Sequence, residues 1–288
     1  MDNSTAEFND NFHSQVLSHK SSLEDRMIDP LYDENQELNT TITIDEIRRL
    51  IHGAKNGKAC GIDSIPYEVL KYESVISVLH SLFQLIFETS IIPSIWRQAI
   101  ICPILKDKTS DERSPLNYRG ISLLTCISKL YSAFINSRVS DYLETNDMLA
   151  DEQNGFRAHR SCEDHIFTLN AIVRNCPKTF ATFIDLKKAF DFVDRDMLLY
   201  QLLLNKIDGK IYNSIKSIYV NTTACIRLND TLTDWFSCNS GVRQGDNLSP
   251  TLFSIFINDL VQEVKDLDLG VSIGNSNLSI LLYADDIV

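Results

Sequence analysis

The sequence has no long uninterrupted apolar segment. No stretch reaches the roughly 18 consecutive apolar residues that a membrane-spanning helix requires. The first twenty residues are polar and acidic, so they also lack the apolar centre of a secretion signal. These absences predict a chain that neither crosses a membrane nor is secreted, and that works inside the cell, in the cytoplasm or the nucleus.

Paired cysteines are missing as well. The chain has seven cysteines; the number is odd, they are widely scattered, and no C-x-x-C spacing joins two of them. Zinc ribbons and redox dithiols depend on such spacing, and secreted disulfide frameworks usually use an even number. The cysteines are therefore predicted to be reduced thiols.

A net positive charge is also absent, since the formal net charge is −12. Proteins that bind nucleic acid gather Lys and Arg to neutralise phosphates, so the total argues against a dedicated nucleic-acid binder. The average hides an uneven distribution, however. Residues 1–50 hold 11 acidic and 4 basic side chains, whereas residues 97–138 hold 7 basic and 3 acidic ones. The second segment is basic enough to neutralise phosphate groups of a nucleic acid or nucleotide.

The chain divides into two regions by pattern. Residues 1–41 are rich in Asp, Glu, Asn and Ser without sustained periodicity, which predicts an acidic, weakly structured leader. Residues 42–288 have the periodicity of a folded unit. Helical spacing follows the possible capping pair Thr43 and Glu46 and returns over 75–89, 129–143 and 162–174. Two short apolar runs around a polar loop predict a hairpin whose arms carry Lys106 and Arg119.

Two carboxylate positions interrupt apolar strands. Asp185 ends the strand-like stretch "TFATFID", and Asp285 and Asp286 lie at the predicted tip of the hairpin "ILLYADDIV". Carboxylate oxygens from different strands are ligands that Mg²⁺ accepts, with phosphates and water in the remaining positions. An Asp-Asp pair alone is more often an ordinary wet turn. The second strand-bound aspartate and the glycine-bounded "GVRQG" turn between them favour the metal interpretation.

Five ordered blocks carry a family resemblance: "NYRGISLL" followed by "SKL", "QNGFRAHRSC", "FIDLKKAFDFVD", "GVRQGDNLSPTLF" and "YADD". In this order and spacing, residues 42–288 resemble the reverse transcriptases of non-LTR (LINE-type) retrotransposons. Group II intron reverse transcriptases share the aspartates, but the first and fourth blocks favour the retrotransposon side. The resemblance implies an α+β fold, the palm and fingers of a right-hand polymerase, with an antiparallel palm sheet and packed helices. It also implies that the chain is truncated just after the YADD motif, with the thumb absent.

The resemblance also implies a role for each matched residue. Asp185 and Asp285 would hold two Mg²⁺ ions, and Asp286 would complete the acidic cluster less directly. The expected reaction is RNA-directed DNA synthesis, in which a DNA primer on an RNA template attacks a deoxynucleoside triphosphate (dNTP). Lys106 and Arg119 would grip the triphosphate, because Arg offers a planar fork and Lys a point charge.

Two further matched residues would select the nucleotide. Phe190, five residues after Asp185, corresponds to the bulky side chain beneath the sugar, where a ring would collide with a 2′-hydroxyl. Gln244, between Gly241 and Gly245, corresponds to a residue near the nascent base pair. Without the family resemblance, Phe190 would be interpreted as a buried core aromatic and Gln244 as part of an ordinary turn.

Other functions are weaker candidates. A catalytically inactive, truncated RNA-binding remnant of the same fold is the alternative, because a thumb supplied only by a full-length element would leave this chain with poor synthesis. A different palm-type nucleotidyltransferase is disfavoured by Phe190 and the "VRQGD" turn. His159, Cys162 and His165 are spaced in threes, but no fourth zinc ligand lies nearby.

Overall fold

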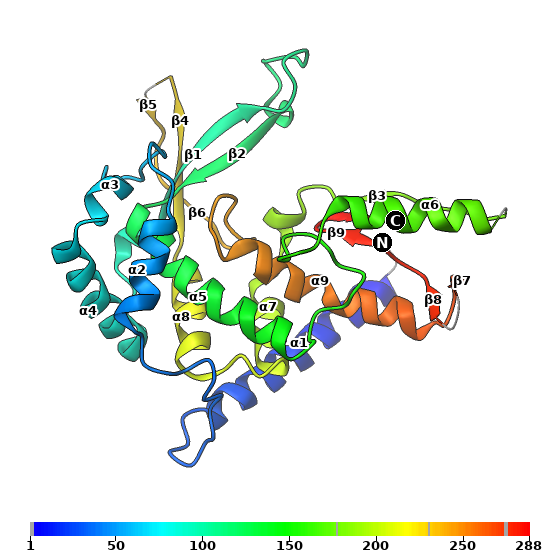
Figure 1. Cartoon of the computed structure of the whole chain (residues 1–288), viewed down its shortest axis with the longest axis horizontal. Helices are drawn as coiled ribbons and strands as arrows, with labels where there is room; N and C mark the ends of the chain where they lie inside the picture. The colour runs from blue at the N-terminus through cyan, green and yellow to red at the C-terminus, as the bar shows by residue number, and fades with distance from the viewer. Residues whose placement is uncertain (1–2, 177, 230, 274–275) are drawn as a thin grey trace.

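The computed structural model describes residues 3–176, 178–229, 231–273 and 276–288. In this part of the chain, helices pack around a five-stranded sheet, a three-stranded sheet and a two-stranded ribbon. Figure 1 shows the β1–β2 hairpin projecting from the helical body, and β3 and β9 lying beside α6 on another side. The predicted α+β class is confirmed.

The helices form most of the core. In chain order they are α1 (Asn3–Arg26), α2 (Ile44–Gly53), α3 (Tyr67–Leu70), α4 (Glu73–Thr89), α5 (Cys126–Thr145), α6 (Cys162–Asn175), α7 (Arg195–Leu204), α8 (Gly209–Tyr219) and α9 (Ser249–Asp266), with 3-10 turns at Ser94–Arg97, Pro115–Asn117 and Ala189–Phe192. Phe83 of α4 meets Tyr131 of α5 edge to face, with ring centroids 5.2 Å apart. Phe87 meets Phe134 in the same way at 5.5 Å. These fully buried rings fix α4 against α5.

The five-stranded sheet carries the predicted hairpin. Its strands are β1 (Gln98–Leu105), β2 (Tyr118–Leu123), β4 (Thr223–Leu228), β5 (Thr231–Leu232) and β6 (Phe236–Ser237). β1 and β2 pair antiparallel, and the register sets Ile104 opposite Arg119. β1 also pairs with β4, in parallel, and β6 pairs antiparallel with β4. The sheet is therefore mixed, and it links residues around 100 to residues around 225.

The three-stranded sheet is antiparallel and holds the aspartates. Its order is β3 (Ile184–Asp185), β10 (Asp286–Ile287) and β9 (Leu282–Tyr283), and β7 (Val271–Ile273) pairs with β8 (Ser276–Leu278) next to it in sequence. Asp286 lies directly opposite Asp185 and also opposite Tyr283. An antiparallel palm sheet was predicted, and this sheet has that arrangement.

Local sequence signals explain where α2 and α4 begin and end. The Thr43 hydroxyl accepts from the Glu46 N–H at 3.2 Å, and the Glu46 carboxylate accepts from the Thr43 N–H at 2.8 Å. This capping box satisfies two N–H groups that the first turn leaves without partners. α4 ends where Ser90 adopts a left-handed conformation with φ 56°. The helix predicted over 75–89 begins two residues earlier, at Glu73, and α2 begins directly after Thr43, as predicted.

The leader differs from its prediction. Weak structure was expected for residues 1–41, whereas Asn3–Arg26 forms α1. Its isolated sequence gives little reason for a helix, so the stabilisation comes from tertiary contacts. Lys20 pairs with Asp196 of α7, Glu24 pairs with Lys216 of α8 at 2.9 Å, and Leu23 packs against the main core.

The sequence predicted no membrane-spanning helix and no paired cysteines, and the described residues bear on both points. None of their helices combines the length and the apolar character needed to cross a membrane. The seven cysteines are all free thiols in the structure.

Candidate active site

A two-residue turn presents the second aspartate. Ala284 and Asp285 connect β9 to β10, and Ala284 has φ 59°. Leu282 and Ile287, one on each strand, are buried at 0% and 5% exposure. The apolar residues around the aspartates therefore anchor the hairpin in the core, while Asp286 and its register partner Asp185 are exposed.

One cavity brings together most of the predicted site residues. Its volume is about 270 Å³, and it is lined by Lys106, Leu116, Tyr118, Arg119, Gly120, residues 185–191, Gln244 and Asp285. Six of the seven predicted residues are in this set, although the sequence separates Lys106 from Asp285 by 179 positions. Asp286 does not line the cavity and adjoins it through Asp185. We refer to this space as the nucleotide cavity.

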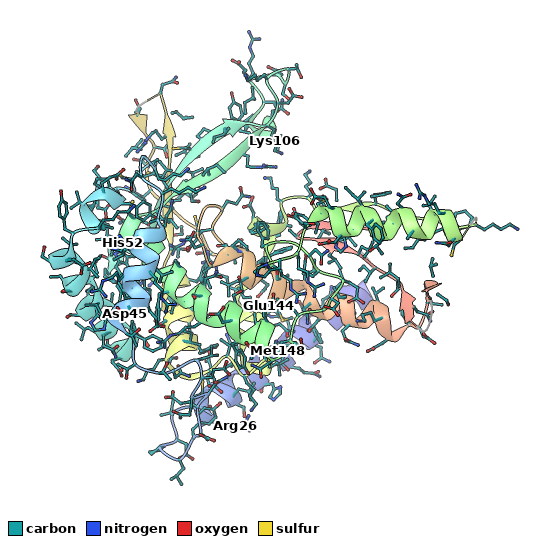
Figure 2. All side chains as sticks on the ribbon, in the orientation of Figure 1. Arg26, Asp45, His52, Lys106, Glu144 and Met148 are labelled. Carbon is teal, nitrogen blue, oxygen red and sulfur yellow. The ribbon has the colours of Figure 1, made fainter. Side chains whose placement is uncertain are left out.

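The charges around the nucleotide cavity are mixed. Four cations (Lys106, Arg119, Lys187 and Lys188) and three carboxylates (Asp185, Asp191 and Asp285) line it. Figure 2 shows Lys106 on the β1–β2 hairpin. Among the described residues, none of these seven side chains takes part in an ion pair within 4.0 Å. The cations therefore remain available to an anionic ligand such as a phosphate chain.

Phe190 forms a rigid wall of this cavity. Its ring stacks on Phe253 of α9, with centroids 4.8 Å apart and planes 11° apart, and it meets Phe156 edge to face at 6.3 Å. The Phe190 carbonyl also accepts from the Val242 N–H at 2.8 Å. Since both ring and backbone are held, the ring cannot swing away from a ligand without breaking this packing.

Gln244 is held by the turn around it. The Ser122 N–H of β2 donates to the Gln244 carbonyl at 2.9 Å. Gly241 has φ 77°, and a Cβ there would lie 2.7 Å from the Phe190 carbonyl oxygen. Only glycine fits this position, because both the conformation and the close approach exclude a side chain. The turn is thereby fixed between β2 and the segment that carries Phe190.

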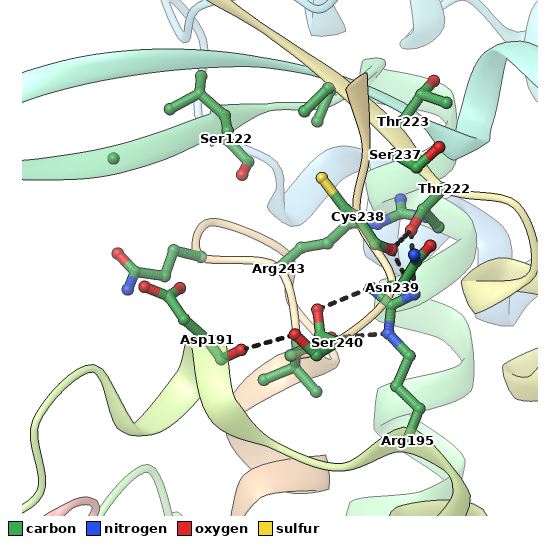
Figure 3. A pocket seen from close by; sticks show the side chains of 17 residues that line it. Ser122, Asp191, Arg195, Thr222, Thr223, Ser237, Cys238, Asn239, Ser240 and Arg243 are labelled. Atoms are coloured by element: carbon green, nitrogen blue, oxygen red, sulfur yellow. Dashed lines mark hydrogen bonds between the residues drawn. The ribbon is translucent and has the colours of Figure 1, made fainter. Parts of the chain in front are cut away.

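Arg195 hydrogen-bonds the backbone of the turn that carries Gln244. It was not singled out from the sequence. Its guanidinium donates to the carbonyls of Cys238, Gly241 and Tyr219 at 2.8–3.0 Å, and also to the Thr222 hydroxyl and the Ser240 carbonyl. Figure 3 shows it beside a second cavity of about 380 Å³, which shares Gly120, Asp191 and Gln244 with the nucleotide cavity. Burial lowers the pKa of Arg195. A single arginine at a helix start gives no sequence signal of burial.

The carboxylates fit a metal that shares its coordination with substrate. Among the described residues, no three His, Cys, Asp or Glu side chains gather as a metal-binding cluster. Mg²⁺, however, is usually held by one or two carboxylates together with substrate phosphates and water. Asp185 and Asp285 line the same cavity as Lys106 and Arg119, and their carboxylates are a suitable donor set for such an ion.

The zinc alternative has no support in this region. His165 uses its Nε2 to contact the Leu282 carbonyl at 2.8 Å, and its Nδ1 lies 3.3 Å from the Asn154 amide. Both ring nitrogens therefore have protein partners.

The family follows from comparison with known proteins. Residues 105–288 match the family described as "Reverse transcriptase (RNA-dependent DNA polymerase)". This match covers more than half of the chain, and the chain belongs to the reverse transcriptase family.

Its relatives narrow the class to mobile elements. The chain is 30% identical over 225 residues to a probable RNA-directed DNA polymerase from transposon BS of Drosophila melanogaster, which covers 76% of this chain and 25% of that protein. It is 25% identical over 260 residues to the RNA-directed DNA polymerase from the mobile element jockey of the same species, covering 86% and 27%. These relatives belong to LINE-type non-LTR retrotransposons, so the predicted family is confirmed.

The chain spans about a quarter of the length of these relatives. Among solved structures, an apo telomerase from Candida tropicalis truncated from the C-terminal domain is similar with a TM-score of 0.45 and 14% identity. That similarity covers 77% of this chain and 55% of the telomerase chain.

Proposed function

We propose that this chain forms the fingers and palm, residues 42–288, of an RNA-directed DNA polymerase. In this reaction a DNA primer, paired with an RNA template, attacks the α-phosphate of a dNTP and releases pyrophosphate. The observation that carries the proposal is the nucleotide cavity, where Lys106, Arg119, Asp185 and Asp285 gather from four separate segments. Cations and carboxylates that pair with no other described side chain are the combination that a metal-bound triphosphate requires.

Lys106 and Arg119 would bind the triphosphate. Arg119 lies in β2 and Lys106 directly follows the last residue of β1; the Lys106 N–H donates to the Asn117 carbonyl at 2.9 Å, which continues the pairing of the two strands. A planar guanidinium can bond two phosphate oxygens at once, while the ammonium adds a point charge. The hairpin would therefore orient the triphosphate along the wall of the cavity.

Phe190 and Gln244 would select the nucleotide. The stacked ring of Phe190 would lie beneath the sugar and exclude a 2′-hydroxyl by contact, so deoxynucleotides are favoured. Gln244, on its fixed turn, would lie against the nascent base pair. Rigid walls suit this role, because discrimination by shape is lost when a wall can yield.

Asp185 and Asp285 would hold two Mg²⁺ ions, with Asp286 adding negative charge from the next strand position. Reverse transcriptases generally use divalent metal ions. Bound Mg²⁺ supplies acidification of the primer 3′-hydroxyl and neutralisation of the leaving pyrophosphate. The part played by the chain would be to keep both carboxylates at the cavity that would hold the reacting phosphate. The RNA template, the DNA primer and a cytoplasmic or nuclear location belong to the same proposal.

Primer extension tests the proposal. The full chain is incubated with an RNA template, a DNA primer, dNTPs and Mg²⁺, and product length is followed on gels. Asp185→Asn, which keeps the shape and removes the charge, is expected to lower the rate by about 10²–10³-fold. Asp25→Asn on the exposed face of α1 is the matched control and should leave the rate unchanged. RNA binding without extension in the wild-type chain would contradict the proposal and favour the inactive RNA-binding alternative.

A further inference from the structure

The side chain of Gln153 hydrogen-bonds the backbone of the Ala284–Asp285 turn. Its Oε1 accepts from the Ala284 N–H at 2.9 Å, and its Nε2 donates to the Ala284 carbonyl at 3.2 Å. Oε1 also accepts from the Gly155 N–H at 2.8 Å. Gln153 is only 1% exposed. One buried amide thus satisfies both backbone groups of the residue next to Asp285, as a neighbouring strand would.

The chain around Gln153 is built to approach this turn closely. The Leu282 N–H donates to the Glu152 carbonyl at 2.8 Å, and the Asn154 N–H donates to the Leu282 carbonyl at 2.9 Å. A Cβ on Gly155 would lie 2.2 Å from the Ala284 nitrogen, so a side chain is excluded there by contact. Gln153 therefore forms an isolated parallel β-bridge with Leu282 of β9.

This segment is itself anchored to the core helices. Arg157 donates to the Gln153 carbonyl at 3.1 Å and to the Ala150 carbonyl at 2.7 Å, and its guanidinium pairs with Glu144 of α5 at 2.8 Å. Glu152 pairs with Lys265 of α9 at 2.9 Å. The segment that holds Ala284 is thus fixed to two long helices, α5 and α9.

The turn needs such support because its conformation is costly. Ala284 has φ 59°, a left-handed conformation that residues other than glycine adopt at an energetic cost. β9 and β10 contribute two residues each, so their own ladder supplies few hydrogen bonds. A left-handed Ala284 persists only where its surroundings determine it, and Gln153 bonds both of its polar groups.

We propose that Gln153 is a positioning residue for nucleotide addition: its side-chain amide holds Ala284 so that Asp285 faces the nucleotide cavity. The inference rests on the proposed polymerase function. Gln153 touches neither substrate nor metal and acts through Ala284. Residues that orient a metal-binding group in this indirect way commonly change metal affinity or activity by roughly ten- to hundredfold.

Three variants of the full chain test the inference. Gln153→Met keeps the length of the side chain and removes both hydrogen-bonding groups, whereas Gln153→Glu keeps the acceptor and removes the Nε2–H donor. Gln84→Met is the matched control, because Gln84 also accepts from a backbone N–H, that of Ile42 at 2.9 Å, but lies in α4 away from the cavity. Circular dichroism checks that each variant remains folded.

The first measurement is hydrogen exchange by NMR, which does not depend on activity. The Ala284 amide should exchange roughly tenfold faster in Gln153→Met, because its acceptor is gone. The Leu282 amide, bonded to the Glu152 carbonyl, should remain protected in the same sample. Unchanged exchange at Ala284 would overturn the inference.

The second measurement is steady-state nucleotide addition. kcat should fall roughly ten- to hundredfold in Gln153→Met, with a smaller loss in Gln153→Glu. KM for the dNTP should change little, because Lys106 and Arg119 are untouched. Faster exchange at Ala284 with an unchanged kcat would show that the grip is structural only, and would overturn the positioning role.

Gly155→Ala tests the position of Ala284 in a second way, through the close contact between residues 155 and 284. The added methyl group should displace Ala284 and lower kcat, while Gly53→Ala, where a Cβ would meet nothing within 4 Å, should leave kcat unchanged. Equal kcat values for these two variants would overturn the inference.

A metal titration separates this inference from the proposed function. If the wild-type chain extends no primer, the polymerase proposal has failed, and Mn²⁺ binding measured by electron paramagnetic resonance then decides the role of Gln153. The Kd for Mn²⁺ is expected to rise roughly ten- to hundredfold in Gln153→Met. An unchanged Kd, or no binding by the wild-type chain, would overturn the inference.

Discussion

Replacing Arg195 by methionine should destabilise the turn that carries Gln244. Of the carbonyls that bond Arg195, those of Tyr219 and Gly241 have no other hydrogen-bond donor among the described residues. The Cys238 carbonyl keeps the Thr222 hydroxyl as a donor, and the Ser240 bond is exposed. Two orphaned buried carbonyls at about 1–3 kcal/mol each give a loss of about 2–6 kcal/mol.

Water in the neighbouring cavity should reduce this predicted loss of stability. Its volume of about 380 Å³ is large enough for water to reach some of the freed carbonyls. We therefore expect the free energy of unfolding to fall by about 2–4 kcal/mol, the lower part of the range. Arg195→Lys should fall between the wild type and methionine, because an ammonium keeps the charge but cannot reproduce the planar fork.

Urea unfolding followed by circular dichroism measures the change. Arg26→Met is the matched control, since Arg26 lies exposed at the end of α1 and should shift stability by less than about 0.5 kcal/mol. If Arg195→Met costs no more than Arg26→Met, the network around Arg195 does not stabilise this turn and the reasoning is refuted.

Two further predictions concern selectivity and pH. Phe190→Val should raise the ratio of ribonucleotide to deoxynucleotide incorporation by roughly tenfold or more, measured by competition in single-nucleotide extension; an unchanged ratio would mean that the ring does not meet the sugar. Burial alone would raise the pKa of Glu46, but hydrogen bonds from Arg138 and Thr43 outweigh it and lower that pKa below 4.5. The stabilisation from Glu46 should thus be complete above pH 4.5 and lost as the pH falls through the lower folded-state pKa. In Glu46→Gln the free energy of unfolding, measured by urea unfolding at a series of pH values, should change less over this pH range.

Prediction from sequence succeeded where a signal was local. The Thr43–Glu46 capping box and the hairpin arms of Lys106 and Arg119 depend on neighbouring residues, and the structure contains both. The ordered motifs also identified residues that gather around the nucleotide cavity. Their roles remain predictions.

What the sequence could not supply was the long-range contacts. α1 has a polar sequence and is held by partners such as Asp196, about 176 positions away. Gln153 lay inside a quoted motif, but the motif gave no indication that its amide grips Ala284, 131 positions away. Arg195 likewise bonds carbonyls 24–46 positions further on. Such partners become visible only when the chain is folded.

The docking of α1 also implies an order of folding events. Its polar partners on α7 and α8 lie 176–192 positions later in the chain. During synthesis, at about 5–20 residues per second, the first helix must therefore wait roughly ten seconds or more before residue 216 has even been made. An isolated helix of this polar composition is marginal in water. α1, although synthesised before its partners on α7 and α8, is thus late to reach its final place, and until then the surface of α7 and α8 that it covers stays open to chaperones.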